Sequence, residues 1–282
     1  MTNQQPDQFS HSPVIVVKAG GAAGVDFDAI CQDAAHRIAR GDQLVLVHGG
    51  SDAATSLGEA LDYPARFITS PSGHSSRYSD LRTMEIFSMA VNGKINSRLV
   101  GTLQSLGVNA LGLSGMDGRL LSAERKKAII SVEGGKRKVI RDDYSGRILQ
   151  VNSALLRDLL AGGYTPVIAP LAVSQEGEAL NVDADRAAAM VAGALKALRL
   201  VLLTAAPGLL RSFPDESSLI RLLERADLDQ AQEYARGRMK KKVLAAREAL
   251  QGGTAGVIIA DGRVTDPILS LIHISEPTIL QV

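Results

Sequence analysis

The chain has 282 residues, of which 45% are hydrophobic, enough to bury a sizeable core in one large domain or in two lobes. Its 31 basic and 30 acidic residues leave a net charge of +1, so the overall charge gives no attraction to nucleic acid or to a membrane surface. Aromatic residues make up only 4% and Trp is absent, which disfavours nucleic-acid modules that stack bases.

The redox and targeting signals are those of a cytoplasmic protein. Cys31 is the one cysteine and cannot form an intramolecular disulfide, and residues 1–12 are polar, without the apolar segment of a signal peptide. The stretch 187–210 is apolar but is interrupted by Lys196, Arg199 and Pro207, so it reads as a helix followed by a strand. We therefore expect a cytoplasmic location and no membrane partner.

Apolar patterning predicts alternating strands and helices. Short runs rich in Val, Ile and Leu predict buried strands at 14–17, 44–47, 166–169, 200–203 and 257–260. Apolar residues at helical spacing predict helices at 27–40, 52–61, 80–106, 152–161, 184–198 and 228–251. This alternation predicts an α/β fold, a three-layer αβα sandwich around a mostly parallel open sheet.

The segment 120–150 departs from this rhythm. Short apolar and basic stretches alternate around glycines there, which predicts β-hairpins projecting from the main sheet. The string S-Q-E-G-E at 174–178 is typical of a connecting loop. We predict that it joins an N-terminal lobe, residues 13–172, to a C-terminal lobe, residues 173–268.

The end of the chain has an unusual sequence. Residues 269–278 read L-S-L-I-H-I-S-E-P-T, which resembles the conceptual translation of a transposon-type sequencing adapter. We expect residues 269–282 to be a non-native tail and assign no function to them, the alternative being a real terminal segment that happens to match.

Two paired-glycine segments follow predicted strands. K-A-G-G at 18–21, with Gly24 shortly beyond, follows the first strand, and H-G-G-S at 48–51 follows the second. Because the carboxyl ends of parallel strands meet at one edge of a sheet, both loops are expected to face one crevice, where backbone N–H groups and Lys18 would bind phosphate. The alternative for either loop alone is a tight turn. The glycine patterns of dinucleotide-binding and Walker A loops are absent.

Two further motifs carry charge. N-V-D-A-D at 181–185 begins a predicted helix, where Asp183 alone would suffice as a cap. G-R-M-K-K-K at 237–242 lies early in another predicted helix, where Lys240 and Lys241 fit a solvated face. Each motif can therefore be interpreted as structural, a helix cap or a solvated helix face, or as part of a functional site.

Taken in order, these motifs resemble the amino acid kinase family. They also include R-Y-S-D at 77–80 and L-L-T-A-A-P-G at 202–208, and the resemblance runs over residues 13–268. Within the family the chain is similar to the acetylglutamate kinase branch, and more closely to the aminoadipate kinases of lysine biosynthesis, whose substrate is attached to an amino-group carrier protein. The strings at 70–80 and 134–146 favour that subgroup.

The resemblance implies that ATP, accompanied by Mg²⁺, phosphorylates the side-chain carboxylate of a bound amino acid to give an acyl phosphate. Lys18 and Lys242 match the lysines that neutralise the transferring phosphoryl group, and Asp185 matches the carboxylate that orients both. Arg77 matches the residue that binds the α-carboxylate of the substrate, and Asn181 matches a substrate-binding amide.

The remaining implied site residues are backbone donors and nucleotide contacts. The first group, toward the γ-phosphate and the attacking carboxylate, is Gly20, Gly21, Gly49 and Gly50, the last two also binding substrate. The second group is Thr204, Pro207, Gly208, Met239 and Lys242. Ala205 stands where the family often has Asp or Asn, which leaves the nucleotide contacts of that loop open. No metal ligand from the protein is expected, and His74 is a possible substrate contact.

Local charge bears on the substrate. The stretch 125–141 holds seven basic residues and one acidic residue, an excess that a small free acid does not require. We expect a small acidic carrier protein to dock there, on Lys136, Arg137, Lys138 and Arg141. The family resemblance also implies substrate binding and homodimer formation through the N-terminal lobe and nucleotide binding by the C-terminal lobe. Two alternatives remain open: an acetylglutamate kinase or dual carrier-bound glutamate/aminoadipate kinase of arginine biosynthesis, and a catalytically silent amino-acid sensor.

Overall fold

The computed structural model describes residues 13–21, 25–71, 73, 75–134, 136–224, 227–268 and 280–281. The expectations for Gly24, for His74, for residues 1–12 and for most of the tail lie outside the described residues.

The chain alternates helices and strands over most of its length. The helices are α1 (Phe27–Ala39), α2 (Ser51–Ala60), α3 (Leu81–Ser88), the π-helix η1 (Met89–Asn96), α4 (Ser97–Ser105), the short η2 (Asp117–Arg119), α5 (Ser153–Ala161), α6 (Ala184–Leu195), the short η3 (Glu216–Ser218), α7 (Leu228–Tyr234) and α8 (Met239–Gln251). The strands are β1 (Val14–Ala19), β2 (Gln43–His48), β3 (Phe67–Thr69), β4 (Ser75–Arg77), β5 (Ala110–Ser114), β6 (Leu121–Arg125), β7 (Ile129–Glu133), β8 (Lys136–Ile140), β9 (Gly146–Val151), β10 (Thr165–Ala169), β11 (Leu171–Val173), β12 (Ala179–Asn181), β13 (Arg199–Thr204), β14 (Leu222–Leu223), β15 (Val257–Asp261) and β16 (Leu280–Gln281).

A mostly parallel sheet forms the centre of the molecule. Among the described residues its strand order is β14-β16-β15-β13-β1-β2-β10-β5, and only the β14–β16 pairing is antiparallel. All five predicted strands lie in this sheet, and β1 pairs with β2 on one side and with β13 on the other. The strand β5 was not predicted, because its sequence A-L-G-L-S has a glycine at its centre.

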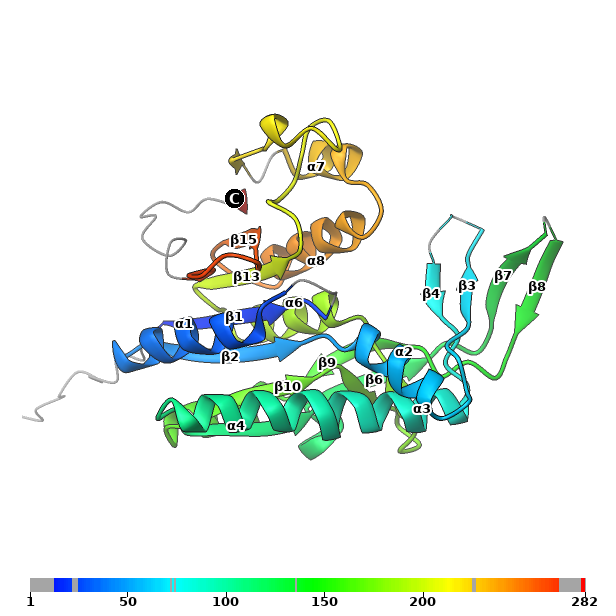
Figure 1. The fold of residues 1–282 in the computed structure, drawn as a ribbon, viewed down its shortest axis with the longest axis horizontal. Helices are drawn as coiled ribbons and strands as arrows, with labels where there is room; N and C mark the ends of the chain where they lie inside the picture. The colour runs from blue at the N-terminus through cyan, green and yellow to red at the C-terminus, as the bar shows by residue number, and fades with distance from the viewer. Residues whose placement is uncertain are drawn as a thin grey trace, which may run out of the picture.

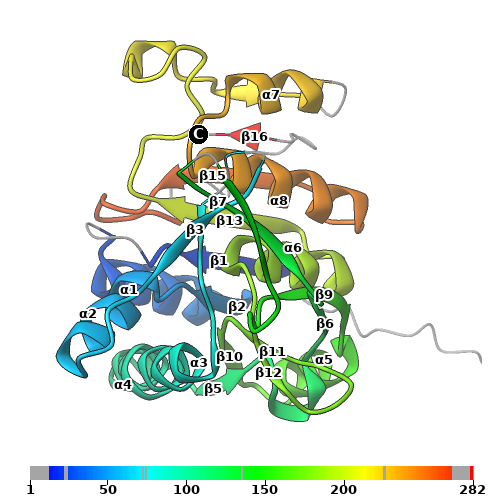
Figure 2. The same cartoon turned by 90° about the vertical axis from the view of Figure 1, so that its right-hand side faces the viewer.

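Helices cover both faces of the sheet, as Figure 2 shows. Successive residues of β1 point to opposite faces: Val16 packs into a core with α6 and α8, whereas Val17 packs into a core with α1 and α4. Both faces of the strands are therefore buried, which explains why the strand sequences are apolar without alternation. The predicted three-layer αβα sandwich is confirmed.

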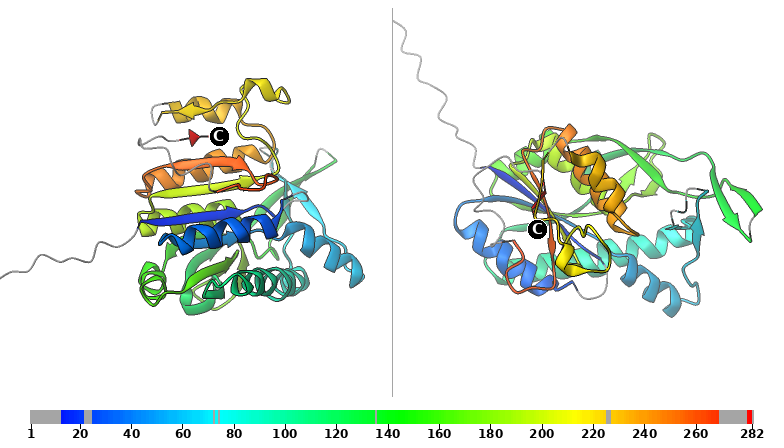
Figure 3. Two further views of the ribbon diagram at one scale, coloured as in Figure 1. Left: turned by 60° about the vertical axis from the view of Figure 1, so that its left-hand side comes forward. Right: turned by 90° about the horizontal axis from the view of Figure 1, so that it is seen from above.

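Two hairpins project from this body, at the right of Figure 1. The β7–β8 hairpin is the one predicted within 120–150, and the β3–β4 hairpin contacts it through β7. The neighbouring strands β6 and β9 pair with each other and join β11 and β12 in a second sheet. Figure 3 shows from two further sides that the hairpins extend beyond the main sheet.

One detail of the predicted organisation is wrong. The helix predicted over 228–251 is two helices, because the chain leaves helical geometry at Ala235 and Gly237 adopts a φ of +52°. Residues 174–178 do form a connecting turn, which joins β11 to β12, and their role as a connection between two lobes stays a prediction. The main sheet runs through both predicted lobes, since β1 pairs directly with β13, and the division into lobes at 172/173 stays a prediction.

Candidate active site

A cleft of about 640 Å³ opens where the strands of the central sheet end. Its lining combines the loops that follow β1, β2 and β13 with residues from the first turns of α6 and α8. These segments lie far apart in sequence and meet because parallel strands present their carboxyl ends at one edge. Of the predicted site residues, those that line the cleft are Lys18, Gly20, Gly21, Gly49, Gly50, Arg77, Asn181, Asp185, Thr204 and Lys242.

The two glycine loops touch backbone to backbone. A Cβ on Gly21 would lie 2.4 Å from the backbone nitrogen of Gly50, and one on Gly49 would lie 2.7 Å from the nitrogen of Gly21. No real side chain tolerates these distances, and rigid backbone lies on both sides. Glycine is therefore required here for the close approach of the loops, which brings their peptide groups to one wall of the cleft.

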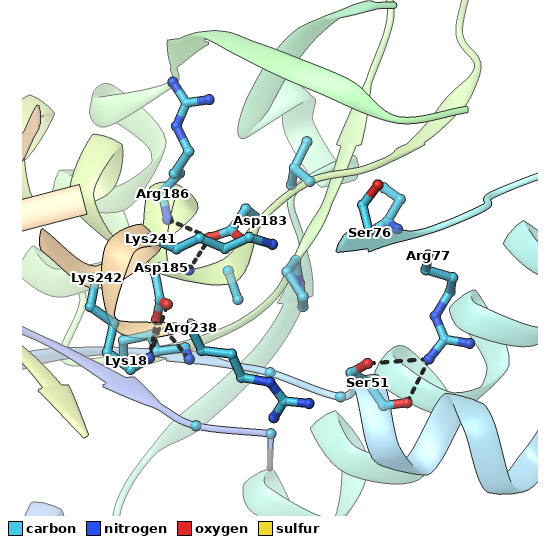
Figure 4. A pocket seen from close by; sticks show the side chains of 18 of the residues that line it. Lys18, Ser51, Ser76, Arg77, Asp183, Asp185, Arg186, Arg238, Lys241 and Lys242 are labelled. Carbon is cyan, nitrogen blue, oxygen red and sulfur yellow. Dashed lines mark hydrogen bonds and ion pairs between the residues drawn. The ribbon is translucent and has the colours of Figure 1, made fainter. Parts of the chain in front are cut away.

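The centre of the cleft is a buried carboxylate between two ammonium groups (Figure 4). Lys18 Nζ lies 2.8 Å from one oxygen of Asp185, and Lys242 Nζ lies 3.0 Å from the other. The three side chains come from β1, α8 and α6, and each residue is at most 7% exposed. Burial alone would raise the pKa of Asp185, but the charges of Lys18 and Lys242 outweigh it and hold the pKa well below its usual range. Burial, together with the charge of Lys18, lowers the pKa of Lys242.

The start of α6 explains how Asp185 is aimed. Asp183 caps the helix by accepting from the backbone N–H groups of Asp185 and Arg186, at 3.0 and 3.2 Å. Its other oxygen lies 3.2 Å from Lys241 Nζ, on α8. The two aspartates therefore have different roles. Asp183 caps the N-terminus of α6, whereas the side chain of Asp185, in the first turn, points into the cleft.

Arg77 lies at the opposite end of the cleft, on β4 (Figure 4). Its Nη2 donates to the carbonyl oxygen of Ser51 at 2.8 Å and to Thr55 Oγ1 at 2.8 Å, and the guanidinium lies over the ring of Phe67. Among the described residues, no carboxylate forms an ion pair with it. Burial of this charge lowers the pKa of Arg77. The arrangement leaves a buried, oriented cation whose charge an acidic ligand can balance.

The side chain of Asn181 is held in place by a chain of hydrogen bonds. Its Nδ2 donates to Ser79 Oγ at 2.9 Å, and the backbone N–H of Ser79 donates to Asp143 at 2.9 Å. The second oxygen of Asp143 accepts from the N–H of Ser145 at 2.7 Å. Asp143 is buried, so this carboxylate ties the end of β4 to the segment before β9 and fixes the cleft wall that carries Asn181.

Several predicted residues lie outside the cleft. Pro207 and Gly208 are not among its described lining residues, and Met239 packs against the apolar core beside α6. Their proposed contact with nucleotide stays a prediction. Lys136, Arg137, Lys138 and Arg141 are exposed on and just after the β7–β8 hairpin. Cys31 is buried, and burial raises its pKa to about 12, as befits a packed thiol.

Other residues of the cleft were not assigned to the site by the sequence analysis, although Asp183 was noted as a helix cap and Lys241 was expected on a solvated face. Ser51, Lys126, Asp183, Arg186, Arg238 and Lys241 line the cleft. Figure 4 shows the guanidinium of Arg238 extending into the cavity from the start of α8, and it forms no ion pair with the described residues. The available signal was the basic string at 237–242, in which the spacing did not show which side chains face inward.

Within the described ranges, no three His, Cys, Asp or Glu side chains gather closely enough to hold a metal ion. In the same part of the chain, no helix has the length and apolar character needed to cross a bilayer.

Fold and cleft together define an α/β protein with a cationic site for an anion between two lysines. The sequence pattern of the amino acid kinase family matches residues 13–261, and the chain belongs to this family. The resemblance stated from the motifs is therefore confirmed, as is the class of phosphotransferase with a carboxyl group as acceptor.

Individual relatives agree with this assignment. A [LysW]-aminoadipate kinase of Deinococcus radiodurans is 52% identical over 255 residues, which cover 90% of this chain and 87% of that protein. An acetylglutamate kinase of Heliobacterium modesticaldum is 37% identical over 260 residues, covering 90% and 86%. Among solved structures, an N-acetylglutamate synthase of Neisseria gonorrhoeae superposes with a TM-score of 0.72 at 26% identity. The match covers 90% of this chain and 55% of that chain.

Proposed function

We propose that this protein transfers the γ-phosphoryl group of ATP to the side-chain carboxylate of 2-aminoadipate carried by a small acidic protein, forming an acyl phosphate for lysine biosynthesis. The observation that carries the proposal is that the Lys18–Asp185–Lys242 cluster and the two glycine loops line one cleft. The name of the relative at 52% identity supports the choice of substrate.

The geometry suits phosphoryl transfer through charge neutralisation. The acceptor carboxylate attacks the γ-phosphorus, the bond to the β,γ-bridging oxygen breaks, and ADP leaves with that electron pair. A carboxylate is already ionised at neutral pH, so no general base is needed. What the protein must supply is positive charge around the oxygens of the transferring group, and Lys18 and Lys242 provide it from β1 and α8.

Asp185 gives these two lysines their positions. Two ammonium groups buried side by side repel each other, and the carboxylate between them offsets this repulsion while leaving one net positive charge. Because each ammonium group is fixed by a hydrogen-bonded ion pair, little reorganisation is needed when the phosphoryl group arrives. In this assignment Mg²⁺ would be bound through the phosphates of ATP and would offset part of their charge, since no three His, Cys, Asp or Glu side chains of the described residues gather to hold it.

Arg77 and Asn181 orient the amino acid in this proposal. Because Nη2 of Arg77 donates to neutral oxygens, the guanidinium keeps its positive charge and its remaining N–H groups, on Nε and Nη1, for a carboxylate of the substrate. Arg77 and the lysine cluster occupy opposite ends of the cleft in Figure 4. The side-chain carboxylate of a substrate bound through its α-carboxylate would thus point toward the phosphoryl group.

The carrier protein is assigned to the β7–β8 hairpin. Lys136, Arg137 and Lys138 are exposed, and Ile130 and Val139, which face each other across the hairpin, are 45% and 55% exposed. Arg125 is not free for a partner, since it bonds Glu178 at 2.8 Å and lies over the ring of Tyr144. An apolar pair edged by cations is the complement of an acidic protein surface.

Hydroxamate trapping of the acyl phosphate tests the reaction. We expect product from carrier-bound aminoadipate and little from free N-acetylglutamate. Turnover of free N-acetylglutamate alone would show an acetylglutamate kinase, the alternative that the relative at 37% identity supports. Turnover of carrier-bound glutamate as well would show a dual enzyme. Amino-acid binding without any product would show a sensor.

The docking assignment has its own test. Replacing Lys136, Arg137 and Lys138 by Ala should raise the KM for the carrier-bound substrate and reduce its dependence on salt, with ATP binding unchanged. The control removes three exposed charges elsewhere, at Arg40, Lys94 and Arg221. Equal effects of the two triple variants would contradict docking on the hairpin. We also infer a homodimer through the N-terminal lobe, which sedimentation equilibrium tests as twice the chain mass.

A further inference from the structure

A buried polar pair lies beneath the second glycine loop. His48, the last residue of β2, is fully buried, and Asn96, the last residue of the π-helix η1, is 7% exposed. Asn96 Nδ2 lies 3.1 Å from His48 Nε2 and 2.8 Å from the carbonyl oxygen of Val167 on β10. His48 Nδ1 lies 3.0 Å from the carbonyl oxygen of Gly49. The pair is not part of the phosphoryl-binding cluster described above.

These contacts determine where the imidazole proton resides. A carbonyl oxygen only accepts hydrogen bonds, so Nδ1 of His48 must carry the proton that it shares with Gly49. The Asn96 amide donates one hydrogen to Val167. Its second hydrogen is shared between Nε2 of His48, at 3.1 Å from Nδ2, and the more distant carbonyl oxygen of Leu113, at 3.5 Å, so Nε2 presents its lone pair. The ring is thus the neutral Nδ1–H tautomer. Burial, and to a smaller extent the charge of Lys18, lower the pKa of His48 to about 4.

The tautomer fixes the orientation of one peptide group. In a trans peptide the C=O and N–H point in opposite directions, so a Gly49 carbonyl held toward His48 turns the N–H of Gly50 away from it. Gly50 lines the cleft, and its N–H bonds to no described acceptor. Gly50 also begins α2 without a side-chain cap, which leaves this donor at the positive end of the helix.

The π-helix allows one segment to hold both the loop and the histidine. Residues five apart lie on the same side of a π-helix, whereas in an α-helix they are about 140° apart. Val91 and Asn96 are such a pair: a Cβ on Gly50 would lie 2.6 Å from Val91 Cγ1, and Asn96 contacts His48. Gly112 on β5 leaves room for this, since a Cβ there would lie 2.2 Å from Asn96 Oδ1.

We propose that Asn96 and His48 are positioning residues, mounted on the π-helix and on β2, which hold the Gly49–Gly50 peptide so that the N–H of Gly50 donates to the transferring phosphoryl group. The inference rests on the proposed phosphoryl transfer and adds to it the origin of one hydrogen-bond donor. A donor of this kind is worth most in the transition state, where charge on the phosphoryl oxygens is greatest.

The tautomer is tested in the wild-type protein without any substrate. Two-bond ¹H–¹⁵N correlation of the imidazole resonances, assigned by comparison with His48→Asn, separates the Nδ1–H from the Nε2–H form. We expect Nδ1–H, with no titration of this ring between pH 5 and 8. An Nε2–H ring, or an imidazolium at neutral pH, would overturn the inference, whatever the enzyme's substrate.

The kinetic test compares variants that keep or remove single contacts. His48→Asn keeps an N–H at the Nδ1 position, whereas His48→Leu has none, and Asn96→Leu removes both donors of the amide. We expect kcat to fall at least ~10-fold for the two Leu variants, with the KM for ATP changed less than ~3-fold, and a smaller loss for His48→Asn. Asn92→Leu, on the same π-helix, is the control for disturbing the helix itself.

The outcomes separate this inference from the proposed function. If the wild-type enzyme forms acyl phosphate and His48→Leu retains its kcat in a folded state, the positioning role is wrong and the proposed function stands. A loss for His48→Asn as large as for His48→Leu would also contradict the role, since the donor to Gly49 would then not matter. If the wild-type enzyme forms no acyl phosphate from any of the substrates above, the proposed function fails, and the tautomer measurement still decides the arrangement of the pair.

Discussion

The stability of this protein should decline with acidification through one identifiable group, His48. The imidazole is fully buried and accepts a hydrogen bond from Asn96, so protonation would place two donors against each other and a charge in an apolar setting. The charged group facing it is Lys18, which opposes protonation further. In the unfolded chain the same imidazole is solvated and titrates at its ordinary pKa.

The magnitude follows from the two pKa values. His48 titrates near 6.5 when unfolded and at about 4 in the native protein, so between these values the unfolded chain binds more protons and the free energy of unfolding falls as the pH falls. The full effect, reached below pH 4, is about 3 kcal/mol, and about 2 kcal/mol of it is already lost at pH 5. Above pH 7 the contribution to the pH dependence vanishes.

Urea unfolding at pH 7 and pH 5 measures this effect. The wild-type protein and His48→Asn share every other titrating group, so the difference between their pH slopes isolates the imidazole. We expect the variant to lose about 2 kcal/mol less than the wild type on going from pH 7 to pH 5. His36→Asn, at an exposed position on α1, is the matched control and should keep the wild-type slope. Parallel slopes for wild type and His48→Asn would refute the reasoning.

Three further substitutions probe the cleft. Asp185→Asn leaves Lys18 and Lys242 buried without a counter-charge, so we expect a loss of about 3 kcal/mol in urea unfolding and a fall in kcat; wild-type stability would contradict the ion-pair assignment. Gly21→Ala places a Cβ 2.4 Å from the Gly50 nitrogen and should lower the melting temperature. Its control, Gly101→Ala on α4, meets nothing within 4 Å and should raise the free energy of unfolding by up to about 1 kcal/mol. The opposite order of the two melting temperatures would refute the packing argument. Arg77→Lys keeps the charge but not the planar guanidinium, which bonds Ser51 and Thr55 while its other N–H groups stay available. The KM for the amino-acid substrate should therefore rise with the KM for ATP unchanged; a change in the KM for ATP alone would contradict a role of Arg77 in substrate binding.

The sequence predicted the sheet well because its strands are buried on both faces. Runs such as L-V-L-V at 44–47 and L-V-L-L at 200–203 have no polar residue to accommodate, and both are strands in the structure. The short β5 and the β3–β4 hairpin were missed, since their sequences carry no comparable run and depend on tertiary contacts. The break between α7 and α8 was missed because the apolar spacing continues across it.

The π-helix shows a different limit of prediction. The apolar spacing over 80–106 correctly predicted a continuous helical segment, which the structure divides into α3, η1 and α4. Apolar spacing alone does not reveal the change from α-helical to π-helical hydrogen bonding, because that change depends on the neighbours of the helix. Val91 packs against Gly50, and Asn96 contacts His48 and Val167. One sequence signal of the π-helix was available: a polar residue, Asn96, in a helical segment that packs against the buried sheet.

The charged residues of the cleft are close in space but far apart in the sequence. Seven cationic side chains and two anionic ones line the cleft, in a chain whose net charge is +1. They come from positions between 18 and 242, so the sequence does not show them as one group. The basic strings visible along the chain, at 125–141 and 237–242, contain four of them. Some of these charges are held in ion pairs, as Lys241 is by Asp183, while Arg77 and Arg238 form none with the described residues. Ligands that balance the charge of the whole cleft must therefore carry negative groups at separate places. A nucleoside triphosphate and a dicarboxylic amino acid, bound side by side, do this together.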